Sequence, residues 1–364
     1  MTDPAAPARP VPRWLHAWAI LTAAATLVLL ILGQLVTSFI AGMADPIWPT
    51  EPWYLFVVDW QEPNRGWLIE HSHRIAGFVI GGLVSALALG IWWTHPNRAG
   101  RWLGLAALVV LAIGTARAGN YPRGTGLRLL GVAALLAVMV QGLLGGFRVK
   151  LNELVGTDLA TIHGVFAQVV FCLLVAVAVL TGRPPAAELP ADSRRTVGRL
   201  ALTVVGVVFV QLLWGAMLRH TPDPLNQRLH LLTAFVVVAA AVWLLRAGFA
   251  DPAARVRVAP AGWVLGGLLA LQVALGVEAW MTKFGAYTLP ELVPITPQSA
   301  AIRTLHTLVG TGVLASAVAL TIAVWRPRSG SGSEGESEAS ESAAMTPAGS
   351  ALTLAHSGQP GGTT

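Results

Sequence analysis

Long stretches of apolar residues, separated by short polar segments, dominate the chain. A run of about 20 apolar residues is long enough to cross the hydrocarbon core of a membrane as a helix. Eight such runs occur, near residues 14–41, 70–93, 127–147, 159–181, 199–218, 227–249, 261–281 and 300–325. The pattern therefore predicts an all-α integral membrane protein with eight transmembrane helices.

A shorter apolar run, residues 102–116, has arginines on both flanks. At 1.5 Å per residue it reaches only about 21 Å of a roughly 30 Å core. We expect an interfacial or re-entrant helix here, within an insertion near 95–126, and not a ninth span.

The composition agrees with a membrane protein. Hydrophobic residues make up 54% of the chain and charged residues only 12%, whereas about a quarter of a soluble domain is charged. The basic residues fall in short loops, so the positive net charge reflects topology and not nucleic-acid binding. The one cysteine, Cys172, excludes an intramolecular disulfide and a thiolate metal cluster.

Most arginines lie at the two termini and in the loops on the same side of the predicted membrane. The positive-inside rule places these regions in the cytoplasm. We expect a multi-pass protein of the bacterial plasma membrane with both termini cytoplasmic. The first apolar run is too long for the core of a cleavable signal peptide and is expected to remain as the first span.

The runs divide into two halves that echo each other. Alternate runs carry a glutamine beside small residues, and the runs between them carry histidines. An even number of spans per half makes the repeat parallel and predicts two pseudo-symmetric four-helix bundles. The expected organisation is an N-terminus (1–13), a first bundle (14–181), a linker (182–198), a second bundle (199–325) and a disordered tail (326–364).

Four histidines occupy matching positions in this repeat. His73, His163, His230 and His306 each lie in the first turns of a run entered from the same side. Histidines in hydrocarbon normally have a partner or a function. Two helices that carry one facing imidazole each can hold a haem iron between them. The four histidines are therefore candidate metal ligands of two haem sites.

The segment from Glu70 to Arg74 contains several ionisable side chains close together at the start of a span. Glu70 and His73 are three residues apart and share a helical face, and Arg74 is four from Glu70 and can pair with it. This arrangement offers a proton acceptor, an iron ligand and a partner for a haem propionate. The alternative is an ion pair at a helix end in the headgroup zone.

Several motifs resemble those of the haem A synthases, membrane proteins that make haem A for cytochrome oxidase assembly. The resemblance covers most of residues 14–325. It rests on the following segments: Gly33–Ser38, Ala41–Met43, Trp48–Thr50, the Glu-x-x-His-Arg motif at Glu70–Arg74, Gln141–Gly146 and Ile162–Gly164.

The resemblance implies a haem-dependent oxidoreductase that converts a methyl group of haem O to a formyl group. The second bundle would hold haem b as a cofactor through His230 and His306, with Arg303 near a propionate. The first would bind the substrate haem O through His73 and His163, with Glu70 needed for turnover and Arg74 as a further cofactor contact. Partners would be the lipid bilayer, a farnesyltransferase that produces haem O and an electron acceptor or donor; a homo-oligomer is compatible with this.

Two other classes remain open from the residues. A di-haem electron-transfer cytochrome would use the same four histidines without needing Glu70. A haem-handling assembly factor or transporter would bind haem and release it unchanged.

Overall fold

The computed structural model describes residues 11–45, 65–94, 125–185, 188–221, 223–285 and 293–326, and within them it contains helices and no strand. The helices are α1 (Arg13–Ser38), α2 (Arg65–Thr94), α4 (Thr125–Lys150), α5 (Asn152–Val155), α6 (Asp158–Thr181), α7 (Ala191–His220), α8 (Pro224–Ala250), α9 (Pro252–Phe284) and α10 (Pro297–Trp325). Apart from the short α5, these are the eight helices long and apolar enough to cross a membrane. The prediction of an all-α membrane protein with eight transmembrane helices is confirmed.

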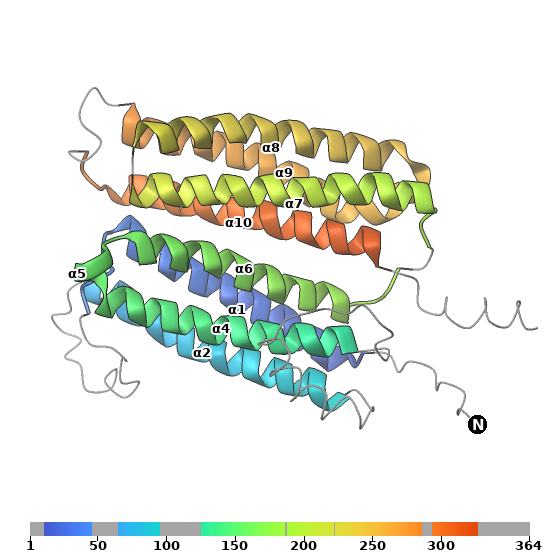
Figure 1. Ribbon diagram of the computed structural model, residues 1–364, viewed down its shortest axis with the longest axis horizontal. Helices are drawn as coiled ribbons and strands as arrows, with labels where there is room; N and C mark the ends of the chain where they lie inside the picture. Colours follow the sequence, from blue (N-terminus) through green and yellow to red (C-terminus); the bar gives the residue numbers. More distant parts are fainter. Residues whose placement is uncertain are drawn as a thin grey trace, which may run out of the picture.

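The long helices form two groups of four (Figure 1). In the first group α1 packs on α2, α2 on α4, α4 on α6, and α6 on α1; in the second, α7, α8, α9 and α10 follow the same cyclic order. In each group the second and fourth helices therefore occupy opposite corners. The groups meet where α6 and α1 contact α10 and where α6 contacts α7.

Each group has a core of its own. In the first, Leu15 and Leu87 are among the fully buried side chains, and in the second Leu244 and Leu320 are. Many large apolar side chains lie on the outside, among them Phe78, Leu89, Leu143, Phe235, Trp243 and Trp263. Such a surface would be unstable in water but suits lipid, which supports a position within the bilayer.

Local sequence explains where the last three helices begin. Each starts at an oxygen-bearing side chain followed by proline: Asp223-Pro224, Asp251-Pro252 and Thr296-Pro297. The side-chain oxygen accepts a hydrogen bond from a free backbone N–H, and proline fits the first helical position. Asp251 is the C-cap residue of α8 and also the N-cap residue of α9.

Several helices are longer than the apolar runs that predicted them. α2 begins at Arg65 and α7 at Ala191, whereas the runs begin at 70 and 199. The predicted linker 182–198 is therefore partly helical, because nothing in Asp192–Arg199 stops a helix that begins after Pro190. The run 102–116 and all but the first residue of the tail lie outside the described residues.

The two ends of the bundle differ. The first turns of α2, α6, α8 and α10 lie at one end, here called the histidine end (Figure 1). The described N- and C-terminal residues lie at the other, here called the terminal end. There, the guanidinium of Arg326 donates to the carbonyls of Val179, Leu180 and Gly182 at the close of α6, at 2.8–2.9 Å.

Candidate functional site

The four predicted histidines form two pairs, one inside each bundle. His73 on α2 faces His163 on α6, with ring centroids 6.5 Å apart and ring planes at 87°. His230 on α8 faces His306 on α10, at 6.3 Å and 82°. In both bundles the pair joins helices at opposite corners, so the rings meet in the bundle interior.

The spacing of the rings fits two ligands on opposite faces of one iron. An imidazole nitrogen binds a first-row metal at about 2.0 Å and lies roughly 1.2 Å from its ring centroid, so two such rings have centroids about 6.4 Å apart. The measured distances of 6.5 Å and 6.3 Å agree with this value. The centroid spacing of both pairs therefore suits one iron between the two rings.

The donor set favours haem over a bare metal ion. Among the described residues, no group of three or more histidine, cysteine, aspartate or glutamate side chains could hold a metal ion. A porphyrin supplies four ligands of its own and needs only two from the protein. The rings of His73, His230 and His306 each form a hydrogen bond with the backbone of the neighbouring helix, at Leu29, Gln211 and Gln272. A hydrogen bond of this kind fixes the orientation of a histidine whose other ring nitrogen binds a metal.

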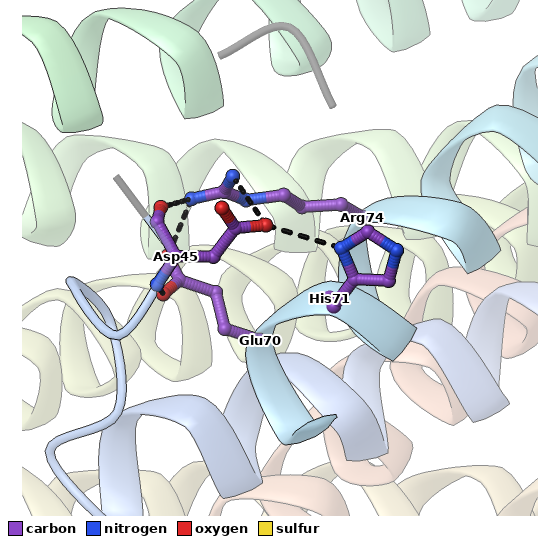
Figure 2. A network of polar contacts seen from close by, with 4 residues as sticks. All are labelled: Asp45, Glu70, His71 and Arg74. Atoms are coloured by element: carbon purple, nitrogen blue, oxygen red, sulfur yellow. Dashed lines mark hydrogen bonds and ion pairs between the residues drawn. The ribbon is translucent and has the colours of Figure 1, made fainter. Parts of the chain in front are cut away.

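A compact polar cluster lies beside the first pair on the chain (Figure 2). Arg74 donates from Nη2 to Glu70 Oε1 at 2.8 Å and pairs through Nη1 with Asp45 Oδ2 at 3.1 Å. His71 Nδ1 lies 3.1 Å from the same Asp45 oxygen. The Asp45 backbone N–H donates to Glu70 Oε2 at 2.8 Å. All four side chains are buried.

This cluster has no counterpart in the second bundle. Asp45 and Glu70 are the buried carboxylate residues among the described part of the chain, whereas Glu278 of α9 is exposed. The expected ion pair between Glu70 and Arg74 is present. His71 lies outside the histidine pair, stacked on Trp67 with ring centroids 4.3 Å apart. The two bundles therefore share a histidine pair but differ in their nearby proton-exchanging groups.

The two arginines predicted as cofactor contacts differ in availability. Both terminal nitrogens of Arg74 are engaged by Glu70 and Asp45. Arg303 of α10 lies one turn before His306, and its Nε is buried without a hydrogen-bond partner. Arg303 is thus the better placed of the two to meet a propionate.

Sequence reasoning missed two residues. Asp45 follows the first span, and its role depends on a loop that returns to α2, so only its acidity at this end of the span could have drawn attention to it. Arg219 of α7 crosses between the bundles, where it donates to Gln34 Oε1 at 2.7 Å and Ser38 Oγ at 2.6 Å on α1, and to Thr307 Oγ1 on α10 at 2.9 Å. An arginine near a helix end gives no sign of this in the sequence.

Fold and site together define a multi-pass membrane protein with paired interior histidines. Residues 57–244, about half of the chain, match the model of a family described as "protein of unknown function (DUF998)", and the chain belongs to this family. No curated protein and no solved structure matches the chain.

The family match corrects the expected membership in the haem A synthases, which is wrong. The structure gives a physical reason why the motifs were misleading. Gly33, Gly145 and Gln141, which carried part of the resemblance, pack against interior histidines. Short motifs of this kind meet the packing needs of a histidine inside a helical bundle and do not identify a family.

Proposed function

We propose that this protein is a di-haem membrane oxidoreductase. The observation that carries the proposal is the geometry of the two histidine pairs, with ring centroids 6.5 Å and 6.3 Å apart in the bundle interiors. Haem supplies one-electron chemistry, and the protein supplies ligation, orientation and proton handling. His73 and His163 would hold one haem, and His230 and His306 the other.

The difference between the bundles supports a division of labour. The first pair has Glu70 and Asp45 on the elements beside it, and the second has no buried carboxylate among the described residues. Oxidation of a carbon centre releases protons together with electrons, whereas electron transfer needs no proton acceptor. We assign the reaction to the first bundle and a permanent haem b, used for electron transfer, to the second.

The reaction proposed for the first bundle is oxidation of the methyl group of haem O to a formyl group. Water supplies the oxygen; the substrate loses four electrons, and four protons are released from the methyl group and the water together. Glu70 and Asp45 are the groups placed to take up protons, and Arg74 holds their carboxylates in position through its two ion pairs. The electrons require an acceptor, which is a partner of unassigned identity.

The extracted pigment tests this proposal. The full-length protein would be expressed with and without a farnesyltransferase that produces haem O, and its haems separated by chromatography. Haem A or a hydroxylated haem in the co-expressed sample supports the oxidoreductase. Unchanged haem O contradicts the reaction, and a protein purified without any haem contradicts the haem sites themselves.

A second candidate is a di-haem electron-transfer cytochrome. The near-identity of the two pairs favours it, because their centroid distances differ by only 0.2 Å (6.5 and 6.3 Å) and their ring angles by 5° (87° and 82°). It predicts two haem b groups and no modified haem in the same chromatogram. In either case we propose a bacterial plasma membrane location with both termini in the cytoplasm.

A further inference from the structure

Each of the four histidine rings packs against a glycine on a neighbouring helix. The glycines lie on the helices that occupy the other two corners of each bundle. A Cβ built on each glycine would approach Cε1 of the ring at these distances: Gly33 to His73 2.8 Å, Gly145 to His163 3.2 Å, Gly215 to His230 3.0 Å and Gly276 to His306 3.2 Å.

These approaches leave little room for a side chain, because the ring would have to move to accommodate one. Contacts of 3.0–3.4 Å are tighter than nine in ten real Cβ contacts, and contacts under 3.0 Å essentially never occur. An imidazole whose edge lies this close to a glycine of the neighbouring helix has restricted rotation about its Cβ–Cγ bond. The glycine therefore limits the plane of the ring as well as its position.

A glutamine supports the same arrangement on three of the four helices. It lies four residues before the glycine, on the same helical face. Gln141 Nε2 donates to the His163 carbonyl at 3.0 Å, and Gln211 Nε2 donates to the His230 carbonyl at 2.9 Å. Gln272 Nε2 lies 3.4 Å from Nε2 of His306. On α1 the equivalent position is Leu29, which lacks the amide side chain. Its backbone hydrogen-bonds the His73 ring, as the backbone of Gln141, Gln211 and Gln272 does for the other three rings, so all four sites share the glycine and this backbone contact.

The angle between the two ring planes is similar in both bundles. The two rings of each pair stand nearly perpendicular, at 87° and 82°. We propose that Gly33, Gly145, Gly215 and Gly276 are positioning residues that fix the planes of the four imidazoles, so that the two axial ligands of each haem are held perpendicular. This inference rests on the proposed haem ligation.

Perpendicular ligand planes have a spectroscopic consequence. The two imidazoles then act on different iron d orbitals and leave them close in energy, whereas parallel planes separate them. Oxidised low-spin iron with perpendicular ligands gives an electron paramagnetic resonance spectrum dominated by one feature at large g. Parallel ligands give a rhombic spectrum with three resolved features. Axial ligands are a main means by which a protein tunes a haem.

The experiment compares matched glycine variants in the full-length protein. Gly215→Ala on α7 and Gly276→Ala on α9 place a methyl group against the second pair. Gly206→Ala and Gly267→Ala on the same two helices are the controls, because both glycines are exposed and a Cβ there meets nothing within 4 Å. The purified, oxidised proteins would be compared by electron paramagnetic resonance and by haem content.

The parent protein and both controls should show large-g features. In Gly215→Ala and Gly276→Ala, about half of this signal should move to smaller g or become high-spin, since one haem of two is affected. A rhombic parent spectrum, or parent-like spectra in both site variants, would overturn the inference. A parent without haem would instead refute the proposed function.

Misfolding of one variant leaves the test intact. If Gly215→Ala does not accumulate, the inference is tested with Gly276→Ala, where the approach to the ring is looser. Gly145→Ala, with Gly142→Ala at an exposed position as its control, applies the same test to the first pair. Failure of all three site variants beside three normal controls would show that these glycines serve helix packing alone, and the inference would be wrong.

Discussion

Arg219 of α7 donates a 2.7 Å hydrogen bond to Oε1 of Gln34 on α1, so a cation of the second bundle is held by an amide of the first. Gln34 follows Gly33, where an added Cβ would meet the His73 ring, and Arg219 also donates to Thr307, the residue after His306. The two histidine pairs are thus joined by one short polar connection.

Arg219→Gln should weaken both the protein and the second haem. Loss of charged hydrogen bonds in a buried setting typically costs about 1.5–3 kcal/mol each when the partner remains, so the melting temperature in detergent should fall. Removal of a positive charge beside the His306 helix should also lower the reduction potential of that haem. Arg199→Gln, an exposed position on the same helix, is the control. Equal potentials in the two variants would contradict the electrostatic role.

Replacement of His230 or His306 by alanine should remove the low-spin haem b spectrum assigned to the second bundle. Each change deletes one of two axial ligands, while the chain still inserts because the helix remains apolar. Absorption spectroscopy and haem content per chain are the measurements. His220→Ala, at the same end of the bundle but outside both pairs, should keep the parent spectrum. A His230→Ala, His306→Ala double variant with the full haem content of the parent would refute the assignment.

Glu70→Gln should bind haem at the parent level but slow turnover about 10²–10⁴-fold, the usual contribution of a general acid or base. Glutamine keeps the size of the side chain and can still accept from the Asp45 N–H, but it cannot take up a proton. Asp45→Asn removes the other buried carboxylate, which pairs with Arg74. Comparison of the two variants shows whether turnover depends on proton uptake by Glu70 or on the ion pairs of the cluster. If Glu70→Gln forms haem A at the parent rate, Glu70 has no role in proton transfer.

Reporter fusions should locate both termini in the cytoplasm. An even number of spanning helices puts the two ends on one side, and the arginine-rich loops at the terminal end predict which side. Fusions at Arg183 and after Thr364 should both give cytoplasmic signals. A fusion at Ala118, outside the described residues, should do so too, and a periplasmic signal there would add a ninth span.

Asp251→Ala should destabilise the corner between α8 and α9 by about 1 kcal/mol, the typical contribution of an N-cap. The hydroxyl of Ser193 and the N–H groups of Ala254 and Ala253 lower the pKa of Asp251. A lowered pKa in the folded state means that the carboxylate stabilises the protein above its unfolded pKa of about 3.9 and that this contribution is lost as pH falls further. The difference in melting temperature between parent and variant should therefore be clear at neutral pH and smaller near pH 3. Asp192→Ala, in the first turn of α7 without a capping bond, should have the smaller effect.

The sequence predicted the spans and the histidine pairs because both follow from regular spacing. Hydropathy shows which segments span, and alternate spans must enter the membrane from the same side, which brings the four histidines to one end. The partners of a side chain depend instead on helix rotation. In the sequence Gln34 lies beside small residues, as Gln141, Gln211 and Gln272 do. In the structure Gln34 faces Arg219, and Leu29 occupies the position four residues before the glycine, where the other helices have their glutamine. Asp45 reaches Glu70 and Arg74 only through the fold of a loop, which periodicity does not reveal.

The second bundle is hydrogen-bonded to the first at both the histidine end and the terminal end. Arg219 forms these bonds at the histidine end, and Arg326 forms them at the terminal end through the carbonyls that close α6. Transporters that work by alternating access rock one bundle against the other around a central site. Such rocking would have to break one of these two sets of charged hydrogen bonds in each half-cycle. The placement of the two arginines therefore favours a fixed arrangement of the two bundles over a carrier that opens to each side in turn.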